Sequence, residues 1–317
     1  MKKEFITLII LTFFLSGCSG DTTPSKYIED YSSDASTATN LRESDAAITD
    51  HELQYRTKCD NDGNDLQDEY TLNIDIVDDY IVEIINIDSV NYRIESRLFR
   101  LYSESRSLDV EFTYPMVADM ENLEVQAKIN DYLYNKAYNL LLSYGECVTK
   151  LSAYASYEIA WAGEKFLSIK YIGWEFRSGA AYDSDTLYTA NIDMRTGENL
   201  TLKDFFILDD RFFEAFTSCA IIDDTKYHIF PEAYDYIQRS FTYEQLGVRL
   251  NSADINNTVY TTDYASYFTE KTLGISFGTV KALSSYAEIV ISYEDLMDNI
   301  RLDNDIWFEI MPSLKQC

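Results

Sequence analysis

Apolar residues recur along this chain with two different periods, and these periods restrict the folds open to it. Apolar and polar residues alternate in segments 72–76, 81–87 and 108–114, a pattern typical of strands with one buried face. Over 121–144 the period becomes helical, because Val125, Ile129 and Leu133 share one stripe with Tyr132, Leu140 and Leu141. Gly145 is expected to end this helix.

Further strands are predicted at 92–102, 154–161, 166–176, 186–194, 273–280 and 287–293. A hairpin turn is predicted at 195–198, a short helix from Asp209 or Asp210 to Ile221, and a helical turn from Tyr293. Pro115 is expected to end the strand before the long helix. Strands before and after one long helix predict an α+β fold, an antiparallel sheet with that helix and shorter helices packed on one face. Segment 223–264 has no clear assignment.

The amino terminus has the pattern of a bacterial lipoprotein signal. Lys2 and Lys3 precede an apolar run at 5–15, which is shorter than the ~20 residues that a membrane-spanning helix needs. The run closes with Leu-Ser-Gly-Cys at 15–18, a lipobox. We expect residues 1–17 to be a signal peptide and the Cys18 thiol to carry a lipid anchor on the extracytoplasmic side of the cell membrane. The alternative is an ordinary signal peptide with a chance cysteine.

Composition divides the remaining chain into three parts. Residues 18–50 are rich in Ser, Thr and Asp, so we expect a flexible stalk that begins at the lipidated Cys18. Residues 51–90 hold an acidic loop and the leading strands, and residues 91–317 form the α+β domain.

The chain is strongly acidic, with a formal net charge of −28. Loss of residues 1–17 removes Lys2, Lys3 and Glu4, which brings the charge to −29. Such a surface repels phosphate, so nucleic acid is not an expected partner, whereas cationic proteins and divalent ions are attracted. The charge could equally serve solubility alone.

An acidic segment at 60–69 has part of the pattern of a calcium-binding loop. Asp60, Asp62, Asn64 and Asp68 place oxygens at relative positions 1, 3, 5 and 9. Asp65 replaces the glycine that the turn requires, and Thr71 replaces the bidentate glutamate, so a solvated acidic loop is the favoured interpretation and no cofactor is expected. The two histidines, His51 and His228, are too few for a histidine-based catalytic or zinc site.

Four cysteines remain besides Cys18, namely Cys59, Cys147, Cys219 and Cys317. An even number in an exported chain predicts two disulfides, with three pairings open, and free buried thiols are the alternative.

Several segments resemble one protein family. They are Tyr-Pro at 114–115, Lys-Ile-Asn at 128–130, Phe-Leu-Ser at 166–168, Ser-Gly-Ala at 178–180, and the stretch from Asp193 through Thr-Gly at 196–197 to Leu-Thr-Leu-Lys-Asp-Phe-Phe at 200–206. With segment 286–296, they resemble the paired extracellular domains of unknown function found in the anti-sigma factor RsiV and amino-terminal to the deacetylase in PdaC. The resemblance covers residues 92–300. The family's Gly-Gly-Ala-His loop reads Ser-Gly-Ala-Ala at 178–181 here.

The resemblance implies a stand-alone, lipid-anchored module that binds or senses and does not catalyse. Its relatives bind lysozyme, so a cationic protein of this kind is one candidate partner and a cell-wall ligand is another; the changed loop could equally mark a different ligand. The alternative is an enzyme or enzyme accessory acting on peptidoglycan or other glycans. We expect Phe176, Tyr182 and Trp174, in and beside loop 177–185, to form the binding surface. Cross-strand packing is the competing explanation for the many strand tyrosines.

Overall fold

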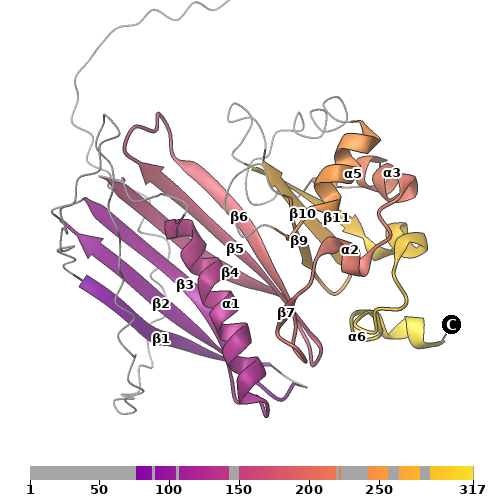
Figure 1. Cartoon of the computed structure of the whole chain (residues 1–317), viewed down its shortest axis with the longest axis horizontal. Coiled ribbons are helices and arrows are strands. Elements are labelled where there is room, and N and C mark those ends of the chain that lie inside the picture. Colours follow the sequence, from indigo (N-terminus) through magenta and orange to yellow (C-terminus); the bar gives the residue numbers. More distant parts are fainter. Residues whose placement is uncertain are drawn as a thin grey trace, which may run out of the picture. The chain divides into compact units, whose positions relative to one another are not determined.

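The first sheet of the protein has seven strands in sequence order. The computed structural model describes residues 76–87, 90–104, 107–142, 150–218, 221–222, 242–255, 264–278 and 286–316. The strands of the first sheet are β1 (Ile76–Asn86), β2 (Arg93–Ser103), β3 (Leu108–Ala118), β4 (Leu151–Ala162), β5 (Phe166–Arg177), β6 (Ser184–Asp193) and β7 (Glu198–Asn199). One helix, α1 (Leu123–Leu142), lies along this sheet (Figure 1).

The predicted α+β fold is confirmed, and the sheet is mixed because one strand pair departs from the expected antiparallel arrangement. Leu108–Phe112 of β3 pairs in parallel with Leu151–Ala155 of β4, whereas the other pairs in the sheet are antiparallel. The long helix lies between these two strands in the sequence, and a helix is the usual connection between parallel neighbours. The helix that the sequence predicted at 121–144 is therefore a crossover.

Pro115 does not end β3, contrary to expectation, because its missing N–H is not needed. The N–H and C=O of Val117 both bond to the side chain of Asn130 on α1, at 2.7 and 2.9 Å. These backbone groups therefore point away from β2. Residues two apart in a strand point their backbone groups to the same side, so Pro115 also faces away from β2 and interrupts no ladder bond.

The helix α1 closes the core of the first sheet. Asn122 begins it by accepting hydrogen bonds from the N–H groups of Glu124 and Val125. Ile129 and Leu133 are fully buried against strand residues of the same face. The apolar stripe that defined the helix in the sequence thus faces the sheet.

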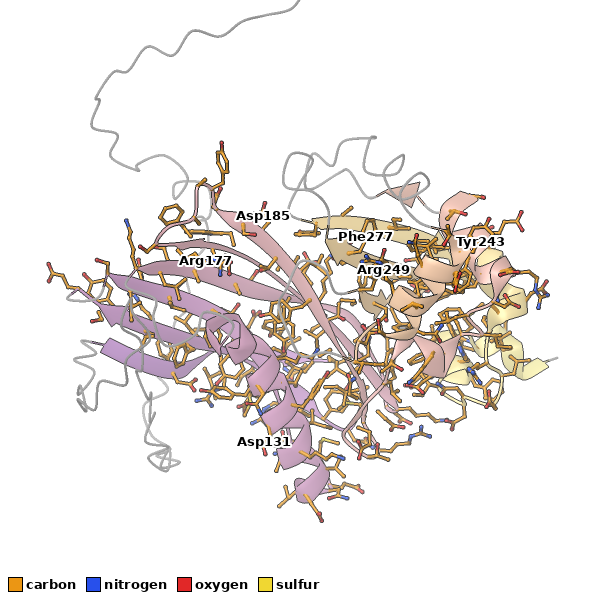
Figure 2. All side chains as sticks on the ribbon, turned by 45° about the horizontal axis from the view of Figure 1, so that its top comes forward. Asp131, Arg177, Asp185, Tyr243, Arg249 and Phe277 are labelled. Atoms are coloured by element: carbon orange, nitrogen blue, oxygen red, sulfur yellow. The ribbon has the colours of Figure 1, made fainter. Side chains whose placement is uncertain are left out.

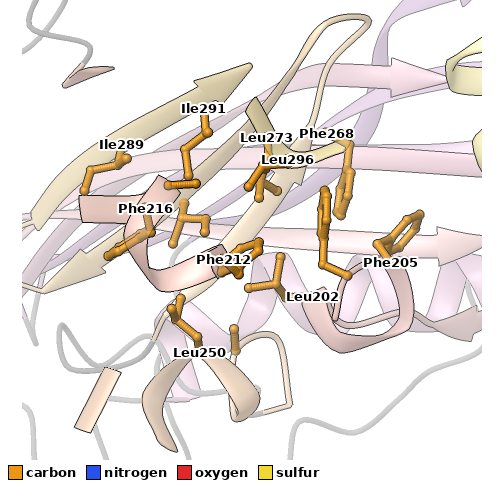
Figure 3. Packing of buried hydrophobic residues seen from close by; sticks show 14 of the residues in the cluster. Leu202, Phe205, Phe212, Phe216, Leu250, Phe268, Leu273, Ile289, Ile291 and Leu296 are labelled. Carbon is orange, nitrogen blue, oxygen red and sulfur yellow. The ribbon is translucent and has the colours of Figure 1, made fainter. Parts of the chain in front are cut away.

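A second sheet has its own core, which the prediction of one sheet missed. Its strands, in the order β8-β11-β10-β9, are β8 (Ile221–Ile222), β9 (Ala265–Phe268), β10 (Thr272–Gly278) and β11 (Tyr286–Ser292), all antiparallel. The shorter helices pack with this sheet and not with α1: α2 (Leu202–Phe205), α3 (Asp210–Ser218), α5 (Tyr243–Asn251), η1 (Tyr293–Asn299), α6 (Trp307–Ile310) and η2 (Pro312–Gln316). Figure 3 shows Phe205, Phe212 and Phe268 in this core.

The individual elements agree well with the sequence patterns. The strands predicted at 92–102, 154–161, 166–176, 186–194, 273–280 and 287–293 are confirmed as β2, β4, β5, β6, β10 and β11. The helix from Asp209 or Asp210 is confirmed as α3, and Asp209 accepts from the N–H of Phe212 at 3.2 Å. The turn before β7 contains Gly197 at φ +68°, and η1 begins at Tyr293 as expected.

The pair Gly274–Tyr267 gives a test of the second sheet. These residues are direct partners on β10 and β9, and a Cβ on Gly274 would overlap the ring of Tyr267. We expect Gly274→Ala to lower the free energy of unfolding by about 1–3 kcal/mol in denaturant titrations, because the strands must separate or the ring must move. The same change in a Tyr267→Ala background should cost much less. An equal cost in both backgrounds would show that the ring is not the cause.

Candidate functional site

The side chains of β5 divide between two faces of the first sheet. Leu167, Ile169 and Tyr171 point into the core with α1, where the hydroxyl of Tyr171 donates to the carbonyl of Leu133 at 3.2 Å. Successive side chains of a strand alternate between faces, so Phe166, Ser168 and Lys170 point to the other face, as do Ile172, Trp174 and Phe176. This second face has a covered part and an open part.

The second sheet covers the face where β5 begins, through the buried ring of Phe166 and through polar contacts. Ser168 donates to Asn191 of β6 at 2.8 Å and accepts from the N–H of Phe268 at 3.0 Å. Asn191 donates to the carbonyl of Ser266 at 2.8 Å. These bonds fix β9 over β5 and β6, because buried polar groups must be paired.

A buried ion pair ends the covered part. Nζ of Lys170 lies 2.9 Å from Oε1 of Glu288 on β11, and the two side chains are 7% and 1% exposed. The hydroxyl of Tyr267 donates to the same oxygen, and Nζ of Lys170 lies 4.8 Å from the centre of that ring. Glu158 of β4 lies 3.7 Å from Lys170 on the more exposed side. Lys170 therefore has carboxylates close to its buried ammonium group, and Glu288 has an ammonium group and a hydroxyl close to its buried carboxylate. Buried charges require such partners.

Asp254 connects the covered part to the start of α2. Its carboxylate accepts from the N–H and hydroxyl of Ser266, at 2.7 and 2.6 Å, and from the N–H of Leu202 at 3.0 Å. Burial raises the pKa of Asp254 above its ordinary value. The Asp254 side chain thus joins the start of β9 to the start of α2, which lies about 60 residues earlier in the chain.

Beyond Lys170 no described element covers the same face, and exposed aromatic residues lie across it. Trp174 of β5 is directly opposite Tyr154 of β4, and each is 41% exposed. The row continues to Glu111 on β3 and Arg100 on β2 on one side, and to Asp185 on β6 on the other. We call these residues, with Phe176 and Lys150, the open face.

A second, shorter row lies nearer the hairpin loop. Phe176 is opposite Ser152, and Nζ of Lys150 lies 5.6 Å from the centre of the Phe176 ring, within the range of a cation–π contact. The loop that follows β5 turns at Gly179, where φ is +83°. Figure 2 labels Arg177 and Asp185, which flank this loop. Tyr182 within the loop is 73% exposed.

Charges of both signs border the aromatic pair. Burial raises the pKa of the Asp185 carboxyl, and neighbouring Asp183 raises it further. Nε of Arg100 lies 4.0 Å from a carboxylate oxygen of Glu111, with both side chains largely exposed. The open face therefore combines flat apolar rings with hydrogen-bonding groups at its margin.

The three predicted aromatic residues lie in one region of the structure, and further residues that were not predicted lie beside them. Trp174 and Phe176 share a face of β5, and Tyr182 lies in the adjoining loop. The sequence reasoning did not single out Tyr154, Lys150, Glu111 or Asp185 as site residues, since their place depends on strand register. Both explanations for the strand tyrosines apply, because Tyr171 and Tyr188 are buried and stacked with ring centres 4.8 Å apart, whereas Tyr154 is exposed.

Several predicted sites lie outside the described residues. These are the lipidation site Cys18, the acidic-loop residues Asp60, Asp62, Asn64 and Asp68, the cysteines Cys59, Cys147, Cys219 and Cys317, and both histidines. Within the described ranges, no group of three or more His, Cys, Asp or Glu side chains is placed to hold a metal ion. No helix in that same part of the chain has the length and apolar character needed to cross a membrane.

Comparisons with solved structures found distant neighbours of this chain. No family model matches the chain, and no curated protein matches it. A solved structure of a DUF3298 family protein from Bacteroides fragilis is similar, with 14% identity, coverage of 71% of this chain and 100% of the other, and a TM-score of 0.42. A DUF3298 family protein from Pseudomonas aeruginosa has 10% identity, coverage of 68% and 96%, and a TM-score of 0.35. Similarity at this level establishes neither a shared fold nor a shared function.

Tryptophan fluorescence tests the exposure of the open face. The chain has three tryptophans, of which Trp307 is fully buried and Trp174 is a large exposed side chain. We expect Trp174→Phe to remove the largest share of the emission that acrylamide quenches, with the melting temperature unchanged. If Trp161→Phe removes more of it, the described face is not the accessible one.

Proposed function

We propose that this protein is an extracytoplasmic, lipid-anchored binding module that takes a protein or cell-wall ligand on the open face. The observation that carries the proposal is the exposed pair Tyr154–Trp174 on a sheet face that no described element covers. Aromatic side chains supply large contact areas with little loss of conformational freedom, and they dominate many binding surfaces. The resemblance to the extracellular domains of RsiV and PdaC supports a binding role.

The distance between Glu111 and Asp185, the two carboxylates beside the aromatic pair, does not fit glycoside hydrolysis between them. Glu111 and Asp185 lie at opposite ends of the aromatic row, three strand spacings apart. With strands ~4.8 Å apart, that is about 14 Å. Two carboxylates that cleave a glycosidic bond lie about 5–9.5 Å apart. Glu111 and Asp185 therefore lie on either side of the aromatic pair and are too far apart to form a catalytic dyad with each other. The alternative, an enzyme or accessory acting on peptidoglycan or other glycans, is an outcome of the test below.

Two ligand classes fit the open face, and charge separates them. A cationic protein would be drawn by the net charge of −28, and its association would weaken with salt. A glycan would stack on Tyr154 and Trp174 and bind with little dependence on salt. The salt dependence of binding therefore identifies the class of ligand.

Titration calorimetry of the purified full-length chain with lysozyme and with soluble peptidoglycan fragments tests the proposal. We expect one of them to bind, and Trp174→Ala to weaken that binding by about 10- to 30-fold, the loss typical of a central aromatic contact. Tyr243→Ala is a matched control, because Tyr243 is similarly exposed but lies on α5. Absence of binding, or equal weakening by both changes, would contradict the proposal. Release of sugar products would favour the enzyme alternative.

The anchor has a separate test. If Cys18 carries the lipid, Cys18→Ala should abolish incorporation of labelled palmitate in a bacterial host, because the lipid is attached through the Cys18 thiol. Cys317→Ala should leave the label unchanged. Label retained in the Cys18→Ala protein would refute the anchor and leave the binding surface untouched.

A further inference from the structure

We propose that the outer edge of β1 accepts an extended, basic segment of a partner protein as an additional strand. The proposal does not depend on the open face. It rests on the backbone, the side chains and the charge of this one strand.

The edge of β1 is long and unpaired within the described residues. β1 has eleven residues and pairs only with β2. The other outer strands that the structure describes are short: β7 and β8 have two residues each and β9 has four. The free side of β3 near Val117 is occupied by Asn130. Proteins normally shorten or cover strand edges in these ways, because unpaired backbone groups bind other strands.

The direction of the free backbone groups follows from the ladder. Val117 points its N–H and C=O away from β2, so its partner Ile94 points its own groups away from β3 and toward β1. Ile94 pairs with Ile85, which therefore faces β2. The neighbouring residues Ile84 and Asn86 face outward. Their N–H and C=O groups are placed to bond an added strand.

The side chains of β1 also suit an added strand. Tyr80, Ile81, Val82 and Ile84 are 44–49% exposed, although they are large and apolar. An added strand would bury part of each, because side chains on neighbouring strands contact one another. A bulge between Ile81 and Glu83 interrupts the register with β2, so an added strand would follow the edge most regularly on one side of the bulge.

The negative charge of this chain favours a basic partner segment as the added strand over a second copy of the chain. Glu83 is exposed and, among the described residues, has no ion-pair partner, whereas Asp79 already lies 3.0 Å from Arg97. A second copy would bring another net charge of −28 to the same edge. An extended segment with alternating apolar and basic residues would satisfy the backbone, the apolar side chains and Glu83 together.

Hydrogen exchange with a synthetic probe tests the proposal. The probe is a seven-residue peptide of alternating lysine and valine, and the control peptide has glutamate in place of lysine. With the full-length chain, we expect the lysine peptide to slow exchange of the Ile84 amide by at least about tenfold, because that N–H becomes bonded. The glutamate peptide should have no effect. Glu83→Lys should weaken binding of the lysine peptide by about 5- to 10-fold.

Matched variants separate the edge from general attraction to an acidic protein. Ile84→Lys places a charge on the edge and should abolish the protection, whereas Val248→Lys, at a 70% exposed position on α5, should not. Trp174→Ala should also leave it unchanged, which separates this result from the open face. The proposal is overturned if no β1 amide slows, if both peptides slow exchange equally, or if protection appears without peptide and rises with protein concentration.

Discussion

The ion pair between Lys170 and Glu288 is the interaction on which the arrangement of the two sheets depends. It joins β5 of the first sheet to β11 of the second, with both side chains buried and Tyr267 bonded to the same carboxylate oxygen. A charge buried without its partner costs several kcal/mol, so the second sheet cannot shift along the first without exposing or separating the pair. The hydrogen bonds of Ser168 and Asn191 restrict the position of the second sheet further. Each can form only at one position of β9 along β5 and β6.

The extent of this contact determines what remains accessible. The second sheet covers β5 from Phe166 to Lys170, and the same face continues to Trp174 and Phe176, where no element of the described ranges covers it. β5 thus serves two purposes, since its first half contacts the second sheet and its second half contributes Trp174 and Phe176 to the open face. The edge of β1, which pairs with no further strand among the described residues, belongs to the same sheet, so both proposed binding surfaces lie on one sheet.

The sequence predicted which segments form strands and helices better than it predicted which strands pair with one another. Alternation and helical period located β2, β4, β5, β6, α1 and the last strands, because these patterns depend on local geometry. The parallel β3–β4 pair and the second sheet were missed, because pairing depends on contacts between distant segments. Trp174 and Phe176 were predicted as surface residues from their place beside a loop. Tyr154 could be chosen from the neighbouring tyrosines only once its opposition to Trp174 was known.

A double-mutant cycle on Lys170 and Glu288 tests most directly whether the buried pair fixes the two sheets together. Denaturant unfolding would be measured for Lys170→Met, Glu288→Leu and the double variant. The account predicts that each single change costs about 3–5 kcal/mol, because one charge is left buried and unpaired, and that the double variant recovers most of that loss. Single changes that cost less than about 1 kcal/mol and simply add in the double variant would contradict it.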